Sequence, residues 1–137
     1  MILHHRQRIL ILKRSGNVRT MKFRWAGISG YIENESPLER ALKEIKEETG
    51  LTNKSVSLAG VGPPLEAVEP SMPTVIWIVH PFLFNSNTLQ INMDWEHVEY
   101  KWISPKDILK YNTVPRLEEV VYLLYRNTVN KESYKGK

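Results

Sequence analysis

Three glutamates near the middle of the chain, Glu44, Glu47 and Glu48, have the spacing of one helix face. Residues three and four positions apart are neighbours on an α-helix, so the three carboxylates would lie within about one turn. Like charges at that spacing repel each other. A divalent cation such as Mg²⁺, which prefers hard oxygen ligands, would turn this repulsion into a binding site. The simpler alternative is a solvated acidic face, because glutamate is a good helix former.

The residues around these glutamates predict a helix with defined ends. Ser36-Pro37-Leu38-Glu39 offers a capping serine, a proline at the first helical position and a glutamate that completes a capping box. Gly50 supplies the C-terminal stop. Between these ends the i, i+3, i+4, i+7 pattern of a buried stripe is formed by Leu38, Ala41, Leu42 and Ile45. The glutamates lie more than about 90° round from this stripe. We therefore expect them on an exposed face, where Arg40 can pair with Glu44.

This segment resembles the box of the Nudix hydrolase family, G-x5-E-x7-R-E-U-x-E-E-x-G-U, where U is aliphatic. With the register anchored on the second glycine, the matching residues are Glu35, Glu44, Ile45, Glu47, Glu48, Gly50 and Leu51. Two positions depart from the pattern. Lys43 stands where the family has arginine, and Ser29 stands where it has glycine. Gly30 follows one residue later, so the loop to Glu35 looks one residue short. Every carboxylate is kept, and the chain is identified as a member of the family.

The family resemblance implies a function and a set of site residues. Nudix enzymes hydrolyse a phosphoanhydride (pyrophosphate) bond in a nucleoside diphosphate linked to another group, using Mg²⁺ or Mn²⁺. By resemblance, the metal ligands are Glu44, Glu47 and Glu48, and a backbone carbonyl near Ser29 or Gly30 adds another. Glu47 and Glu48 are also catalytic candidates, since one of the box glutamates can act as the base; which one is left open.

Two further box residues have positioning roles by resemblance. Lys43, at the arginine position, would orient a neighbouring glutamate, and we count it among the catalytic residues. Lysine is a point charge rather than a planar fork, so it would do this less rigidly than arginine. Glu35 would position the loop or reach the metal through water.

A carboxylate outside the box is expected in the acidic segment Asp94 to Glu99. Nudix enzymes often recruit such a residue, and Glu96 is our candidate for an accessory ligand or general base. The Glu96-His97 pair resembles a Glu-His pair that many family members carry before a tryptophan-containing strand. Glu99 is the alternative, although alternation along the strand places it beside Lys101, with which it can pair.

Charge is distributed unevenly along the chain. Residues 1–32 contain seven Lys or Arg and no Asp or Glu, and the remaining residues contain twelve basic against fifteen acidic side chains. A basic segment ahead of an acidic helix suits a polyphosphate substrate. We predict substrate contacts at Arg14, Arg24 and Trp25, the last by stacking on a base. The alternatives are a solvated basic edge and core packing of the tryptophan; Tyr31 and Trp77 carry the same two alternatives. Nucleic acid is not expected as the main partner, because aromatics do not alternate with the basic residues.

The rest of the chain predicts an α/β fold in a single domain over residues 1–137. The expected strands are 8–13, 56–60, 74–84, 89–93 and 98–103; helices are expected from Pro105 and over 115–126, with a frayed tail from about residue 130. The segment 74–84 reads as one long buried strand with His80 as a core histidine. Strands interrupted by helices indicate an α/β layer architecture. The resemblance sharpens this to a Nudix α/β/α sandwich with a mixed β-sheet.

Composition limits the remaining choices. At 137 residues and 42% hydrophobic content the chain suits one globular core. No cysteine is present, which excludes disulfides and thiolate sites. The first residues do not form a secretory signal, and no apolar run is long enough to span a bilayer, so we expect a cytoplasmic protein without a membrane partner.

This functional hypothesis has two alternatives. A catalytically idle Nudix fold that serves as a nucleotide sensor or regulatory module is kept open by the Lys43 and Ser29 departures. A diphosphate isomerase of the same fold is excluded, because by resemblance it needs an active-site cysteine. The identity of the small diphosphate substrate cannot be read from the sequence, and a homodimer is left open.

Overall fold

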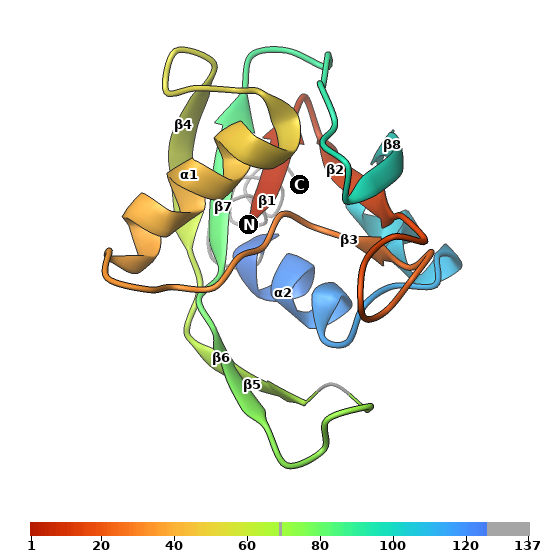
Figure 1. Cartoon of the computed structure of the whole chain (residues 1–137). Helices are drawn as coiled ribbons and strands as arrows, with labels where there is room; N and C mark the ends of the chain where they lie inside the picture. The colour runs from red at the N-terminus through yellow and green to blue at the C-terminus, as the bar shows by residue number, and fades with distance from the viewer. Residues whose placement is uncertain (69, 126–137) are drawn as a thin grey trace.

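A computed structural model describes residues 1–68 and 70–125 of the chain (Figure 1). Its main sheet has six strands, β1 (Ile2–His5), β2 (Arg8–Arg14), β3 (Trp25–Ala26), β4 (Val56–Val61), β7 (Phe82–Ser86) and β8 (His97–Ile103). The strand order is β3-β2-β1-β7-β4, in which β1 pairs with the first residues of β2 and β3 with its later residues. Strand β8 pairs along the length of β2, at the edge opposite to β1 and β3. The β1–β7 pair is parallel and the other pairs are antiparallel. The mixed sheet is therefore confirmed.

Helices cover both faces of this sheet. Along β2, Ile9 and Ile11 point to one side and pack in a core with α2 (Leu117–Leu124). Leu10 and Leu12 point to the other side and pack in a core with α1 (Pro37–Thr49). Alternate residues of a strand face opposite sides, so a strand buried on both faces reads as a continuous apolar run. The two cores confirm the α/β/α sandwich.

The segment 74–84 is two strands rather than the one that the sequence predicts. Strand β6 (Ile76–Val79) pairs with β5 (Leu65–Val68) in a separate two-stranded ribbon, whereas β7 belongs to the main sheet. His80 and Pro81 separate them, because proline has no N–H to donate to a ladder. The ribbon extends away from the body in Figure 1. His80 is half-buried at this break, so its placement in a buried strand was wrong.

Other differences concern short elements. The predicted strand over 89–93 is a loop: Ile91 is buried in the core and the N–H of Asn92 donates to the Thr49 carbonyl at the end of α1. The helix after Ser104 is a 3-10 helix, η1 (Pro105–Lys110). The predicted last helix begins at Leu117 rather than at residue 115; its predicted end at 126 and the frayed tail lie outside the described residues. In the described part of the chain, no helix is long and apolar enough to cross a membrane.

Candidate active site

Helix α1 presents the box glutamates between two well-formed ends. The Ser36 hydroxyl accepts a hydrogen bond from the Glu39 N–H at 3.2 Å, and the Glu39 carboxylate accepts one from the Ser36 N–H. At the other end, Gly50 adopts the left-handed conformation with φ 77° and its N–H donates to the Lys46 carbonyl. Both predicted ends are thus confirmed. They fix the rotation and length of the helix that carries the acids.

The buried face of α1 differs from the predicted stripe. Ala41 and Ile45 are buried as expected, whereas Leu38 and Leu42 are exposed. Glu44 and Glu48 are buried instead, with exposed fractions of only 6% and 3%. The expectation of an exposed carboxylate face was therefore wrong for these two residues. The physical reason is that loops from distant parts of the sequence cover them, which helical periodicity does not reveal.

Glu44 lies in a close-fitting niche made by its own helix and the loop before it. Its Oε1 is 2.6 Å from a guanidinium nitrogen of Arg40, which confirms the expected i,i+4 pair. A Cβ added at Gly30 would lie only 2.2 Å from the carboxyl carbon of Glu44. No side chain fits there without moving the carboxylate. Gly30, one residue later than the family's glycine position, is thus required by the approach of Glu44.

Glu48 is held by two groups from distant parts of the sequence, one before α1 and one well after it. The N–H of Ser29 donates to Oε2 of Glu48 at 3.3 Å. The Nε2 of His97 lies 3.5 Å from Oε1 of Glu48, and the Nδ1 of the same ring lies 2.8 Å from Oδ1 of Asp94. Sequence reasoning did not assign Asp94 or His97 to the site. The available signal was the Glu96-His97 pair, which was used only to choose Glu96.

The electrostatics of this cluster indicate excess negative charge. Burial, a hydrogen bond shared with Glu44 and three nearby carboxylates raise the pKa of Glu48 to about 10. Burial also raises the pKa of Glu44, and the negative charges of Glu47 and Glu96 contribute to this rise. A raised carboxyl pKa means that the neutral form is favoured until a cation compensates the charge. The site is therefore suited to a cation.

The segment before β8 brings a further carboxylate to the cluster. The carbonyl of Glu96 accepts a hydrogen bond from the Ser15 N–H at 2.7 Å, which ties this segment to the β2–β3 loop. The Glu96 charge raises the pKa of both Glu44 and Glu48, so it lies near them. Glu99, the alternative candidate, is exposed and lies 3.9 Å from Lys101, as alternation along the strand predicts. Of the two candidates, Glu96 is therefore the one that lies close enough to Glu44 and Glu48 to change their pKa values.

A ready-made metal cage is not present in the described part of the chain: no three Asp, Glu or His side chains are gathered as metal ligands. Glu47, the third predicted ligand, is exposed on α1. Glu44 and Glu48 are instead satisfied by Arg40, Ser29 and His97. The donor chemistry still fits Mg²⁺ or Mn²⁺, since Glu44, Glu48 and the nearby Glu96 offer hard carboxylate oxygens.

Lys43 lies beside the early box glutamate rather than beside a helix glutamate. Its Nζ is 3.6 Å from Oε2 of Glu35, and its side chain is 61% exposed. The N–H of Glu33 donates to Glu35 at 2.8 Å. This hydrogen bond, together with the positive charges of Lys43 and Arg40, lowers the pKa of Glu35. Lys43 thus helps to hold the loop that precedes α1.

The three predicted substrate contacts differ in their surroundings. Arg14 donates from Nε and from a terminal nitrogen to the Thr20 carbonyl at 3.1 and 3.0 Å, so its guanidinium braces the β2–β3 loop. Arg24 is half-buried in the same loop. Trp25 lies in the core, with Tyr111 edge-on to it and Lys101 over its ring at 5.3 Å. The alternative of core packing therefore describes Trp25 better than stacking on a substrate.

Tyr31 and Trp77 form an aromatic pair next to the box loop. Their ring centroids are 4.9 Å apart with an interplanar angle of 32°, and Tyr31 is largely exposed. Tyr31 directly follows Gly30, whereas Trp77 comes from β6 of the ribbon. The pair joins the ribbon to the loop that contacts Glu44.

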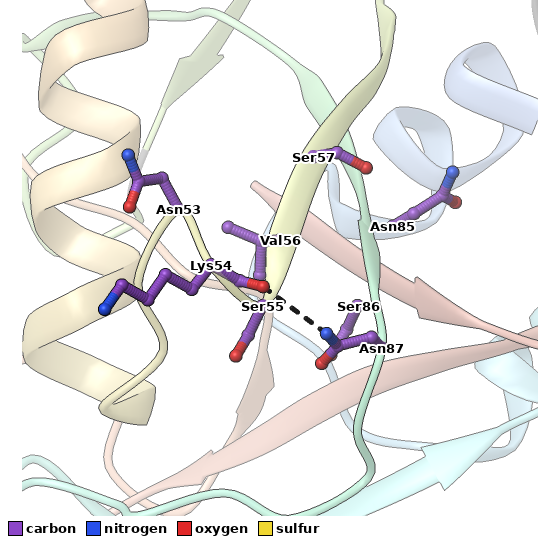
Figure 2. Close-up of a pocket in the computed structure, with 8 residues that line it drawn as sticks. All are labelled: Asn53, Lys54, Ser55, Val56, Ser57, Asn85, Ser86 and Asn87. Carbon is purple, nitrogen blue, oxygen red and sulfur yellow. Dashed lines mark hydrogen bonds between the residues drawn. The ribbon is translucent and has the colours of Figure 1, made fainter.

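A shallow hollow lies at another place on the surface, where the turn after α1 meets the ends of β4 and β7. Figure 2 shows the polar side chains around it, among them Asn53, Lys54 and Asn87. The Asn87 side chain donates to the Lys54 carbonyl at 3.4 Å, as the dashed line in Figure 2 marks. None of the box acids lines this hollow. The hollow is therefore separate from the cluster of box acids on α1.

Comparison with known proteins agrees with this fold. The NUDIX domain family matches residues 1–124. A Nudix hydrolase from Nitrosomonas europaea has a TM-score of 0.74 at 14% identity, covering 93% of this chain and 86% of that chain. A C. elegans Ap4A hydrolase has 0.72 at 17%, covering 88% of each. The MutT protein from Methanosarcina mazei Go1 has 0.66 at 27%, covering 92% and 89%. No curated protein sequence gives a significant match.

Proposed function

This chain belongs to the Nudix family, and we propose that it is a divalent-metal-dependent hydrolase of a phosphoanhydride bond in a nucleoside diphosphate linked to another group. The observation that carries the proposal is the burial of Glu44 and Glu48 with raised pKa values beside further carboxylates. Such a cluster has a strong electrostatic demand for a cation. The matched family and the similar fold of a 27%-identical MutT protein support hydrolase chemistry.

The residues that would hold the metal are Glu44, Glu47 and Glu48, together with the carbonyl of Gly30. Their hard oxygen atoms fit Mg²⁺ or Mn²⁺. When bound, the ion would neutralise phosphate oxygens and lower the pKa of a water molecule. To receive it, Glu44 would exchange its contact with Arg40 for the ion. Arg40 would then be free to turn toward the phosphates of the substrate.

The other side chains of the site would orient the acids and the proton. Ser29 and His97 hold Glu48 from two sides, which limits its rotation. Glu96 has no ion-pair partner among the described residues, and we assign it as accessory ligand or general base. Within the described part of the chain, the Arg24 side chain also has no partner, so we keep it as the candidate phosphate contact. Trp25 is left out because it is buried in the core.

A substrate panel tests the proposal. Nucleoside triphosphates, ADP-ribose, dinucleoside polyphosphates and isoprenoid diphosphates are each assayed with Mg²⁺, with Mn²⁺ and with a chelator. We expect hydrolysis of at least one compound, lost with the chelator and reduced at least about 100-fold by Glu48→Gln, which corresponds to roughly 2.7 kcal/mol of transition-state stabilisation. Glu118→Gln makes the same change at an exposed position of α2, on the other face of the sheet, and should leave turnover unchanged.

Two outcomes would overturn the proposal. Equal turnover in the wild type and Glu48→Gln would remove Glu48 from the metal site. Absence of turnover with every compound, while a nucleotide still binds, would instead support the nucleotide sensor.

A further inference from the structure

The ion pair between Arg40 and Glu44 lies within the cluster of box acids rather than on an open helix surface. A guanidinium nitrogen of Arg40 is 2.6 Å from Oε1 of Glu44, and the two side chains are only 18% and 8% exposed. Exposed i,i+4 pairs are weak because water and salt screen their charges, and burial removes most of that screening. The contact therefore joins two largely buried charges.

The Arg40 guanidinium is only partly satisfied in this position. Its Nε is buried and has no hydrogen-bond partner within the described part of the chain. A hydrogen bond from the Glu33 N–H and the charges of Lys43 and Arg40 lower the pKa of Glu35, so Arg40 lies near this second carboxylate too. A buried donor without an acceptor is costly. The negative charge of Glu44, rather than a complete set of hydrogen bonds, holds Arg40 here.

Glu44 has little room to move away from this contact. Arg40 holds Oε1, and the same oxygen would lie only 2.4 Å from a Cβ added at Gly30. The backbone of Gly30 therefore confines one side of the carboxylate. The proposed metal ligands include Glu44 and the Gly30 carbonyl, so an ion held by both would approach the oxygen that Arg40 occupies.

We propose that Arg40 competes with the divalent metal: it neutralises Glu44 in the metal-free protein and must be displaced before the ion binds. This inference rests on the proposed metal site and adds that Arg40 lowers the affinity of that site. Two cations at contact distance from one carboxylate oxygen repel each other, so the contacts exclude one another. In the metal-free protein, Arg40 keeps the buried Glu44 from being left as an uncompensated charge.

The population of the Arg40–Glu44 contact sets the expected size of the effect. If about 90% of metal-free molecules have the contact, about one molecule in ten can accept the ion, and the apparent affinity falls about 10-fold. The short distance and the burial of both side chains support a population of this order. Removal of Arg40 should therefore tighten metal binding at least about 10-fold.

Titration with Mn²⁺ in the absence of substrate tests the proposal, with unbound Mn²⁺ measured by its electron paramagnetic resonance signal. Arg40→Gln should bind Mn²⁺ at least about 10-fold more tightly than the wild type. Arg40→Lys should lie closer to the wild type, because a lysine four residues before Glu44 can still pair with it. Lys46→Gln is the matched control: it removes one positive charge from an exposed position of α1 and should change the affinity less than about 3-fold.

A second measurement follows the displacement in the wild-type protein and does not depend on the folding of a glutamine variant. The Nε–H signal of Arg40 in a ¹⁵N spectrum is identified by its absence in Arg40→Lys. It should shift when Mg²⁺ is added, because the guanidinium leaves Glu44. The signal of Arg116 should stay in place, since Arg116 pairs with Glu119 at the start of α2, on the other face of the sheet.

The competition and the metal site itself fail in different ways. Absence of Mn²⁺ binding in both the wild type and Arg40→Gln, or equal binding by Glu48→Gln and the wild type, would overturn the metal site and the competition together. If Glu48→Gln weakens binding while Arg40→Gln leaves it unchanged or weaker, only the competition is overturned. Equal tightening by Lys46→Gln, or an Arg40 signal that Mg²⁺ does not move, overturns it as well.

Discussion

The imidazole ring of His97 bridges two carboxylates, with Nε2 at 3.5 Å from Glu48 and Nδ1 at 2.8 Å from Asp94. The His97 side chain is almost completely buried. Because Asp94 holds Nδ1, the ring cannot turn, and Nε2 stays directed at Glu48. A box carboxylate on α1 is thus oriented by the first residue of β8, which makes this strand part of the site.

This relationship predicts that Asp94→Asn and His97→Gln both lower turnover. We expect roughly a 10-fold decrease in kcat with KM within a few-fold, the size typical of residues that orient a metal ligand. Steady-state kinetics with saturating Mg²⁺ gives the two parameters. Val98→Ala is the control, since Val98 is the exposed next residue of β8. Losses that merely follow a lower melting temperature in all three variants would contradict an orienting role.

The raised pKa of Glu48 predicts a pH-dependent stability of the metal-free protein. The group titrates near 4.5 when unfolded and at about 10 when folded. Between these values the folded state binds more protons, so stability falls as the pH rises. We expect the melting temperature in chelator to decrease from about pH 5 to pH 9. Glu48→Gln should flatten this decrease and melt above the wild type at about pH 9. A variant with an unchanged slope would show that Glu48 is already ionised in the folded protein.

A pair of glutamine variants distinguishes the two carboxylates outside the box. Glu96→Gln should lower turnover about 10-fold if Glu96 is an accessory ligand and about 100-fold or more if it is the general base, while substrate affinity stays within a few-fold. Glu99→Gln should be silent, because Glu99 is exposed and lies near Lys101. The reverse result moves the assignment to Glu99. If both variants are silent, the catalytic carboxylates all lie on α1.

Substitution of Lys43 probes its departure from the family pattern. Lys43→Arg should leave activity equal or higher, because a guanidinium can hold Glu35 with two parallel hydrogen bonds. Lys43→Ala should lower activity by about 5-fold or less, since the lost contact is an exposed ion pair worth about 0–1 kcal/mol. Kinetics under identical Mg²⁺ concentrations compares the three proteins. Severe loss in the arginine variant would mean that the site is adapted to lysine.

The contact between Gly30 and Glu44 predicts a selective effect of Gly30→Ala. The added methyl group would meet the end of a flexible side chain, so Glu44 rather than the backbone must move. We expect turnover to fall at least about 10-fold, with a much smaller change in melting temperature. Ser29→Ala is the control: the neighbouring residue is exposed and contributes only its backbone N–H to Glu48. Full activity of Gly30→Ala would show that the position of Glu44 is unimportant.

The extent to which the sequence predicts this structure depends on the range of the interactions. Both ends of α1 and the buried strand β2 follow from local patterns, and the structure confirms them. The burial of Glu48 does not, because it is produced by Ser29 and His97 from distant parts of the chain. The division of residues 74–84 was marked by Pro81, but the apolar run around it concealed the signal. The catalytic roles themselves stay predictions.

The ribbon and the β4–β7 edge of the main sheet are two lengths of one hairpin. Strands β4 and β7 pair with each other, β5 and β6 continue the same pairing, and the N–H of Gly62 donates to the Pro81 carbonyl where the two lengths join. Strand β7 also pairs with β1, whereas within the described residues β5 and β6 pair only with each other. The hydrogen bonds between β5 and β6 can therefore open while the main sheet stays folded. The backbone amides of these two strands should exchange hydrogen with solvent sooner than those of β4 and β7. A single hairpin thus spans two levels of local stability, separated at one glycine and one proline.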